Sequence, residues 1–364
     1  MQPFYTKVYG NSVSLHTFGR QASLALEKCR KQIANFLHAE PQEIIFTGSS
    51  TESNNLALKG IAWANKNKGN HIIISSVEHD CVLNSAEWLE SNGFAVTRLP
   101  VDTYGLVDPK DVAKAIKRST ILVSVMHANN EIGTIEPIEE IGRICRDRQV
   151  LFHTDATQSF GKIPLDVVRM KVDLLTASSH KIYGPKGAAL LYVKRETKIT
   201  PLLHGGGHEF GLRSSTVNLP AIVGFAKAVE LCQKELPKES QRLTMLRDTI
   251  INQVLKTIPG SYLNGPREKR LSNNVNLRFD FVEGEAIVMQ LDFYGIAAST
   301  GSACSSPKLE PSHVLLATNL KPEMAHGSLR LSLGRWTTDS EIDELLCILP
   351  VIIDKLRKIS PFKK

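Results

Sequence analysis

Lys181 and Asp155 are two residues whose side chains could together serve an aldehyde cofactor. A lysine amine forms a Schiff base with an aldehyde, and a carboxylate that faces a pyridine nitrogen keeps that nitrogen protonated as an electron sink. This pair is the minimum equipment of a pyridoxal phosphate enzyme. The same two residues also fit a structural aspartate and a solvated lysine, so the pair alone leaves both interpretations open.

A second group of residues could hold a phosphate. The apolar run at residues 43–47 leads into a Gly-Ser-Ser-Thr string that ends at Thr51, and a helical pattern follows directly. Hydroxyl groups of Ser50 and Thr51 would then meet free backbone N–H groups at a helix N-terminus, although such strings also form ordinary turns and N-caps. Together with His79, whose aromatic ring could lie over a cofactor ring, this string favours the cofactor interpretation.

The elements that must position these residues alternate between short apolar strands and helices over residues 40–195. This alternation is typical of a parallel sheet with crossover helices, so we predict an α/β domain. Ligands bind beyond the carboxyl ends of the strands in such sheets, and polar residues follow most of the runs here. The predicted strands are residues 43–47, 71–75, 95–99, 121–126, 150–153, 174–177 and 190–193, and the predicted helices are 52–65, 81–91, 109–117 and 137–148.

After residue 220 the pattern changes to longer helices with few strands. Helices are predicted at residues 221–235, 239–257 and 285–291 and from Thr338 onward, and strands at 274–281 and 328–333. A length of 364 residues fits about two domains at roughly 150 residues each. We therefore predict a large domain over residues 1–220 and a smaller α+β domain over residues 221–364.

The composition excludes several classes of protein. Hydrophobic residues make up 42% and charged residues 22% of the chain, as in folded globular proteins. No stretch approaches the roughly 18 consecutive apolar residues of a membrane span, and the start lacks an apolar signal core, so we expect a cytoplasmic protein without membrane contact. The net charge of +7 is spread along the chain, which suits an anionic cofactor or an acidic partner better than nucleic acid.

The six cysteines are widely scattered and lack metal-ligand spacing, which argues against a structural zinc site and a disulfide framework. Cys304 lies in a run of small and polar residues, 299–307, as a reactive thiol would. Cys81, near His79, is the competing candidate for a reactive thiol, and we favour Cys304. The other cysteines lie in apolar helical patterns typical of buried thiols: Cys29, Cys145, Cys232 and Cys347.

Six spaced strings of this sequence resemble one family. They lie at residues 51–55, 129–133, 153–158, 178–187, 204–209 and 301–304. This combination resembles the cysteine desulfurases of the class V pyridoxal phosphate-dependent aminotransferase superfamily, and most closely their NifS/IscS branch. The resemblance runs from about Gly10 to the C-terminus. It implies the fold type I of such transferases, a mostly parallel sheet in the large domain and a smaller α+β domain.

The resemblance also assigns roles around the cofactor ring. It implies that Lys181 binds the pyridoxal phosphate aldehyde covalently and that Asp155 pairs with the pyridine nitrogen. His79 would stack on the ring and take part in acid–base steps. Asn130 and Gln158 would form hydrogen bonds around the phenolic oxygen of the cofactor and the substrate.

Further residues are implied as ligands of the phosphate and of the substrate. Ser50 and Thr51, with Ser178 and His180, would hold the phosphate. Thr216 resembles the residue that family dimers lend to the phosphate of the other subunit, so the resemblance implies that this chain forms a homodimer. Arg330 resembles the guanidinium that binds the substrate carboxylate, for which its planar fork is well suited.

The activity implied is the conversion of L-cysteine to L-alanine, with the sulfur left on Cys304 as a persulfide. The sulfur would pass to an iron–sulfur scaffold or another acceptor protein, and Cys304 is also a candidate transient ligand of an iron–sulfur cluster. A selenocysteine lyase or another class V enzyme is the alternative. A transaminase, for instance, would have no need of Cys304.

The start of the chain departs from the family pattern. The opening strand and its Asn-Ala-Thr-Thr type segment are absent, and Ser12 replaces the proline that usually follows Gly-Asn. In relatives that segment lines the substrate entrance and covers part of the dimer. A start codon assigned too late is the simplest explanation, and a weakened or non-catalytic homologue is the other interpretation.

Overall fold

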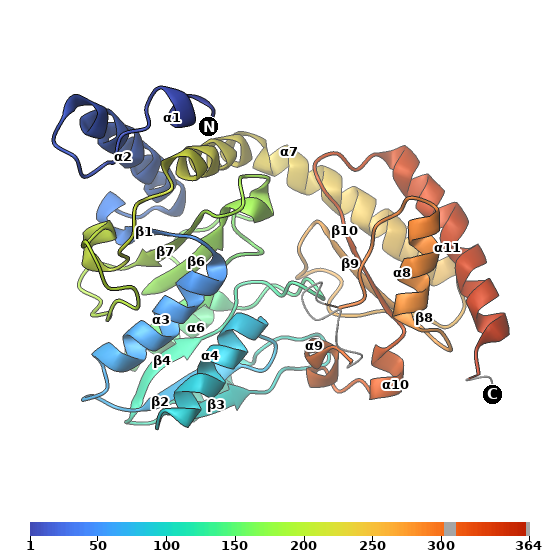
Figure 1. Cartoon of the computed structure of the whole chain (residues 1–364). Helices are drawn as coiled ribbons and strands as arrows, with labels where there is room; N and C mark the ends of the chain where they lie inside the picture. Colours follow the sequence, from blue (N-terminus) through green and yellow to red (C-terminus); the bar gives the residue numbers. More distant parts are fainter. Residues whose placement is uncertain (302–310, 362–364) are drawn as a thin grey trace. The chain divides into compact units, whose positions relative to one another are not determined.

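The computed structural model describes residues 1–301 and 311–361 (Figure 1). Within these residues the chain forms two compact units that interleave along the sequence. The first unit contains residues 1–99, 107–127 and 136–236. The second unit contains residues 100–106, 128–135 and the chain from Pro237 onward.

The first unit is built on a seven-stranded sheet in the order β1-β7-β6-β5-β4-β2-β3, and β7 alone runs against its neighbours. This confirms the predicted mostly parallel α/β sheet, and all seven predicted strands are present. The residues of β2, β4 and β6 are buried throughout, as expected where helices cover both faces of a sheet. The strands are β1 Ile44–Thr47, β2 His71–Ser75, β3 Ala95–Leu99, β4 Thr120–Ser124, β5 Leu151–Asp155, β6 Leu174–Ser178 and β7 Ala189–Val193.

The helices between these strands match the predicted ones, and α3, α4 and α5 each begin with an identifiable cap. Ser49, His79 and Asp108 each accept a backbone N–H at the start of α3, α4 and α5. The sequence analysis missed α1 and the long helix α2, which buries one face through residues such as Ala22 and Ile33. The helices are α1 Pro3–Thr6, α2 Thr17–Leu37, α3 Ser50–Ala64, α4 Asp80–Ser91, α5 Pro109–Ala115 and α6 Ile138–Asp147.

One prediction about helices was wrong. The two helices expected at residues 221–235 and 239–257 are a single helix, α7 Leu219–Thr257, with Pro237 inside it. A proline removes one backbone N–H donor and usually ends or kinks a helix, which is why the sequence suggested a break. The two compact units divide within this helix, between Leu236 and Pro237, whereas the sequence suggested a division at residue 220.

The second unit contains an antiparallel sheet in the order β10-β9-β8. Its hydrophobic core joins the second half of α7 to this sheet and to two helices, through residues such as Ile250, Leu277 and Leu349. The short strand β8 and the helices α9 and α10 were not predicted. The elements are β8 Ser261–Leu263, β9 Asn274–Phe279, β10 Ser328–Ser332, α8 Gly284–Phe293, α9 His313–Ala317, α10 Pro322–Ala325 and α11 Asp339–Ile359.

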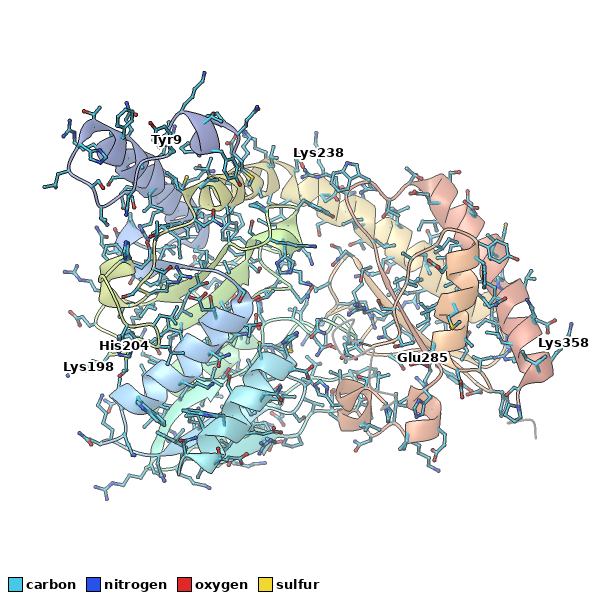
Figure 2. The ribbon with its side chains drawn as sticks, in the orientation of Figure 1. Tyr9, Lys198, His204, Lys238, Glu285 and Lys358 are labelled. Carbon is cyan, nitrogen blue, oxygen red and sulfur yellow. The ribbon has the colours of Figure 1, made fainter. Side chains whose placement is uncertain are left out.

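The outer faces of the helices carry charged side chains, as Lys358 on α11 illustrates (Figure 2). In the described part of the chain, no helix combines the length and the apolar character needed to cross a membrane. The cytoplasmic location stays a prediction from the sequence.

Candidate active site

Asp155 is the last residue of β5 and is only 5% exposed. Its Oδ2 accepts a hydrogen bond from Asn54 Nδ2 at 2.7 Å, and its Oδ1 accepts the Thr157 N–H at 2.8 Å. Among the described residues, no lysine, arginine or histidine forms an ion pair with this carboxylate. Burial of a charge is costly unless a partner compensates it, so Asp155 is ready to receive a cationic group from a ligand.

His79 caps the N-terminus of α4 directly beyond β2. Its Nδ1 accepts the Cys81 N–H at 3.2 Å, so in the neutral ring the proton is assigned to Nε2. The Cys81 sulfur lies 3.1 Å from His79 Nδ1 and 3.1 Å from Asn54 Nδ2. Because Asn54 also donates to Asp155, a continuous series of contacts joins the two predicted residues His79 and Asp155.

Cys81, the competing candidate for a reactive thiol, is poorly suited to that role. Burial, followed by the negative charge of Asp155, raises the pKa of the Cys81 thiol to about 12. The thiolate is the reactive form, so Cys81 stays inert near neutral pH. Cys347 on α11 is exposed, contrary to the expectation that it is buried. Cys304 lies outside the described residues.

Lys181 lies in a short 3-10 helix, Ser179–Ile182, directly after β6. The turn ends at Tyr183, whose φ of 65° is left-handed. Ser178 Oγ and His180 Nδ1 are 2.8 Å apart, so both predicted phosphate ligands belong to one hydrogen-bonded pair. Burial, followed by the positive charges of Lys181 and two further lysines, lowers the pKa of His180.

Lys162 is a residue near the site that sequence reasoning missed. Its Nζ donates to Gln158 Oε1 at 3.4 Å. Burial and, second, the positive charge of Lys181 lower the pKa of Lys162 to about 8. The structure therefore brings Gln158, Lys162 and Lys181 close together. No pattern in the sequence distinguishes Lys162 from an ordinary solvated lysine.

The predicted phosphate ligands Ser50 and Thr51 are the first two residues of α3. Ser49 is the N-cap, and its hydroxyl accepts the Glu52 N–H at 3.1 Å. The N–H groups of Ser50 and Thr51 have no carbonyl partner within the helix, as is general for a first turn. This turn therefore offers backbone donors, two hydroxyl groups and the positive end of the helix dipole to an anion.

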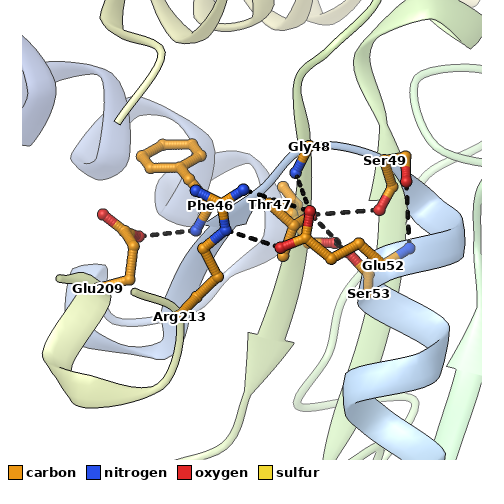
Figure 3. A network of polar contacts seen from close by, with 9 residues as sticks. Phe46, Thr47, Gly48, Ser49, Glu52, Ser53, Glu209 and Arg213 are labelled. Carbon is orange, nitrogen blue, oxygen red and sulfur yellow. Dashed lines mark hydrogen bonds and ion pairs between the residues drawn. The ribbon is translucent and has the colours of Figure 1, made fainter. Parts of the chain in front are cut away.

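A carboxylate–guanidinium pair holds this turn, with Glu52 inside the helix and Arg213 outside it (Figure 3). Glu52 accepts the Gly48 N–H at 2.8 Å through Oε2. Arg213 donates to Glu52 through Nε at 2.7 Å and through Nη2 at 3.3 Å. Thr216 follows in the same segment as Arg213 and is exposed. The sequence string at residues 51–55 contains Glu52, but it could not identify Arg213 as the partner, because Arg213 lies 161 residues away.

A second ion pair, which is buried, anchors the segment 209–216 that contains Arg213 and Thr216. The pair contacts this segment at its first residue, Glu209. Arg30 donates two hydrogen bonds of 2.8 Å to Glu209, and Glu209 also accepts the Phe46 N–H at 2.7 Å. The guanidinium lies 4.8 Å from the centroid of the Phe46 ring and 5.0 Å from that of Phe210. Glu209 and Phe210 have φ values of 49° and 57°, which non-glycine residues rarely adopt, so tertiary contacts must hold them.

Replacing Arg30 should therefore destabilise the first unit strongly. In Arg30→Met the Glu209 carboxylate stays buried without its cation, and we expect a loss of about 3–5 kcal/mol in the free energy of unfolding. Urea unfolding measures it. Arg98→Met is the matched control, because the Arg98–Glu90 pair is 37% and 36% exposed and should contribute less than about 1 kcal/mol. Equal losses in the two variants would contradict this interpretation.

The predicted substrate ligands Asn130 and Arg330 both lie in the second unit. Arg330, in β10, donates from Nη1 to the backbone carbonyl of Asn130 at 3.2 Å. The preceding Asn129 stabilises the loop because its Oδ1 accepts the Glu131 and Ile132 N–H groups at 2.8 and 2.9 Å. The structure therefore brings these two candidates together.

Two histidines at the ends of predicted strands, His127 and His153, are interior residues. His153 lies within β5, where its ring nitrogens contact Ser124 Oγ at 2.8 Å and Thr176 Oγ1 at 3.2 Å. Burial lowers the pKa of His153 to about 4 despite the opposing charge of Asp155, and burial alone lowers the pKa of His127 to about 4. Both rings are therefore neutral in the folded protein at pH 7.

These two histidines should make the folded state sensitive to mild acid. An ordinary histidine titrates near 6.5, so between about pH 6.5 and 4 the unfolded chain binds protons that the folded chain does not. The free energy of unfolding has its full value above this pH range. At pH 5, protonation of each histidine in the unfolded chain should lower the free energy of unfolding by about 2 kcal/mol. Urea unfolding at pH 7 and pH 5 should show a smaller decrease for His127→Gln than for the unmodified protein. His204→Gln, at an exposed position (Figure 2), should leave the decrease unchanged, and an unchanged decrease in His127→Gln would disprove the assignment.

Comparison with known proteins places this chain in a family. The chain matches the aminotransferase class-V family model over residues 1–345. It is 52% identical to cysteine desulfurase IscS of Dictyoglomus turgidum over 364 residues, which cover 100% of this chain and 92% of the relative. It is also 52% identical to cysteine desulfurase IscS 1 of Archaeoglobus fulgidus over 361 residues, or 99% of this chain and 94% of that one.

Solved structures agree with this assignment. A NifS-like protein aligns with a TM-score of 0.91 at 36% identity, over 98% of this chain and 94% of its own. A structure described as SspA in complex with cysteine aligns with a TM-score of 0.82 at 38% identity, over 93% of this chain and 94% of its own. The family match, the seven-stranded sheet and these relatives agree: the chain belongs to the aminotransferase class-V family.

Proposed function

We propose that this chain is a pyridoxal phosphate-dependent cysteine desulfurase that converts L-cysteine to L-alanine and transfers the sulfur to Cys304. The observation that carries the proposal is the buried Asp155 carboxylate, which has two N–H donors and no cation among the described residues. The relatives named cysteine desulfurase, at about 52% identity over nearly the whole chain, support the reaction.

The residues of the first unit fit a pyridoxal phosphate molecule by the chemistry of their donors and acceptors. A protonated pyridine nitrogen is the cation that Asp155 lacks. The first turn of α3 and the Ser178–His180 pair offer donors suited to a phosphate. When bound, the cofactor supplies an electron sink for the α-carbon of the substrate.

The candidate residues around the cofactor would divide its binding among them. Lys181 would hold the aldehyde group, and Asp155 would keep the ring nitrogen protonated. Ser50, Thr51, Ser178 and His180 would bind the phosphate. Thr216, exposed in the segment after Arg213, would serve the phosphate of a second copy in a homodimer.

Three other side chains would move protons, contact the phenolic oxygen of the cofactor and bind the substrate. His79 would present Nε2 to the reacting groups, because its Nδ1 is engaged by the Cys81 N–H. Gln158 would donate a hydrogen bond to the phenolic oxygen. In the second unit, the Arg330 guanidinium would bind the carboxylate of L-cysteine, next to Asn130, whose carbonyl it already contacts.

The sulfur step is balanced without an external oxidant. The C–S bond of L-cysteine breaks, an S–S bond forms on the Cys304 thiolate, and the electron pair of the broken bond stays on the carbon skeleton. The carbon gains one proton, equivalent to the one that the substrate thiol loses, and leaves as L-alanine. The persulfide on Cys304 would then be passed to an acceptor such as an iron–sulfur scaffold protein, with Cys304 as a transient cluster ligand.

The test is the production of sulfide and alanine from L-cysteine by the purified chain with pyridoxal phosphate and a thiol reductant. We expect equal amounts of the two products. Alanine from L-selenocysteine but none from L-cysteine would instead indicate a selenocysteine lyase. Absence of any product, together with absence of visible cofactor absorbance, would overturn the proposed function.

A further inference from the structure

We propose that the Glu52–Arg213 ion pair is a positioning device for the cofactor phosphate, in which Arg213 orients and neutralises a carboxylate at the phosphate turn. This inference rests on the proposed function, because it concerns the same turn at the start of α3. Neither residue is a phosphate ligand in this proposal. Both act through the backbone of the turn and through its local charge.

The first step of the argument is the position of the Glu52 carboxylate. Glu52 lies in the first turn of α3, and its Oε2 accepts the Gly48 N–H at 2.8 Å. This contact closes the chain from Gly48 back onto the helix, while the Ser49 hydroxyl accepts the Glu52 N–H. Glu52 therefore fixes both sides of the turn that presents the Ser50 and Thr51 N–H groups. A Cβ at Gly48 would lie 3.0 Å from the same carboxylate oxygen, so the fit is close.

The second step is electrostatic. Glu52 is an anion at a turn that is proposed to receive a second anion, and like charges at short range oppose binding. Arg213 contacts both carboxylate oxygens, and the two side chains are only 17% and 24% exposed, so solvent screens the pair incompletely (Figure 3). With Arg213 present, Glu52 keeps its orienting hydrogen bond to the turn, and the guanidinium compensates the negative charge of the Glu52 carboxylate.

The third step is the support of Arg213 itself. The segment that carries Arg213 starts at Glu209, whose carboxylate forms the buried ion pair with Arg30. Ser214 Oγ also accepts the Gly207 N–H at 3.3 Å. These contacts hold the backbone on both sides of the left-handed residues that begin at Glu209. Arg213 is thus presented from an anchored backbone, and the planar fork of arginine suits a two-point contact with a carboxylate better than lysine does.

The experiment compares two probes that differ only in the phosphate: pyridoxal 5′-phosphate and pyridoxal. Binding to the full chain is measured by equilibrium dialysis, which does not depend on turnover. For Arg213→Gln we expect binding of pyridoxal 5′-phosphate to weaken at least about tenfold and binding of pyridoxal to change less than about twofold. The double variant Glu52→Gln/Arg213→Gln should recover part of the loss, because the uncompensated charge is gone.

Two further variants separate this role from general stability. Arg213→Lys restores the charge without the fork and should fall between the unmodified protein and Arg213→Gln. Arg98→Gln breaks a similar two-point pair with Glu90, at 2.9 and 2.6 Å, and should leave both affinities unchanged. If Arg213→Gln does not fold, as judged by circular dichroism, the lysine variant and the double variant decide the question.

The outcomes are distinguishable. A selective loss of pyridoxal 5′-phosphate binding with partial recovery in the double variant supports the positioning pair. Equal losses for both probes, or unchanged affinity in Arg213→Gln, overturn it while leaving the proposed function intact. An unmodified chain that binds neither probe overturns the proposed function and this inference with it.

Discussion

Replacing Cys304 by serine should abolish sulfur transfer while the cofactor stays bound. A serine hydroxyl is a weak nucleophile at neutral pH and cannot form the S–S bond, so we expect alanine production from L-cysteine to fall by at least about 10³-fold. Visible absorbance of bound cofactor should be unchanged, because the residues proposed to hold the ring and the phosphate lie elsewhere. Alanine formation and absorbance are measured on the same sample.

Cys347→Ser is the matched control, because Cys347 is an exposed thiol on α11. This variant should keep full activity, which would exclude a nonspecific role of surface thiols. Cys81→Ser tests the remaining competitor, whose pKa of about 12 makes it a poor nucleophile. Unchanged alanine production in Cys304→Ser would show that the proposed sulfur acceptor is wrong.

Asp155→Asn should have the second large effect. An asparagine is neutral and cannot keep the pyridine nitrogen of the cofactor protonated, so the electron sink is lost. Breaking a buried charge pair costs about 3–5 kcal/mol, which corresponds to a decrease in kcat on the order of 10³-fold. Steady-state kinetics with L-cysteine measures this decrease.

The fold should tolerate this substitution, because the neighbouring side chain can adapt. Asn54 donates to Asp155 Oδ2, while Asn54 Oδ1 is buried without a hydrogen-bond partner among the described residues. A rotation of the Asn54 amide would present this oxygen to the side-chain amide of the introduced asparagine. Asp173→Asn, which alters a carboxylate that contacts Phe152 N and Lys194, is the control and should keep its kcat. A kcat within about tenfold of normal in Asp155→Asn would argue against the charge pair.

The parts of the fold that the sequence could predict are those with a local cause. The strands of the large sheet are short apolar runs, and α3 and α4 begin at polar caps, so their positions follow from neighbouring residues. The prediction that the helix breaks before Glu239 was wrong, because Pro237 is accommodated inside α7. Helix α2 was missed, although its buried residues recur at helical spacing.

The same distinction applies to the site. The strings around Asp155, Lys181 and Thr51 indicated the cofactor chemistry, because each contains its functional groups within a few residues. Sequence reasoning did not find the Asn54 contact with Asp155, although Asn54 lies in one of the quoted strings. It also did not find Lys162, whose pKa depends on burial beside Lys181.

The sequence by itself determined the family resemblance, the succession of strands and helices, and the residue types available for the chemistry. Only the tertiary structure decided which distant groups meet. Asn54 and Asp155 are 101 residues apart, Glu52 and Arg213 are 161 apart, and Arg30 and Glu209 are 179 apart. Hydrophobic periodicity and capping act over one or two turns, so they carry no information at such separations. These contacts depend on how the fold places helices, strands and loops from distant parts of the sequence side by side. Burial within the fold also shifts the pKa values of Cys81, His153 and Lys162.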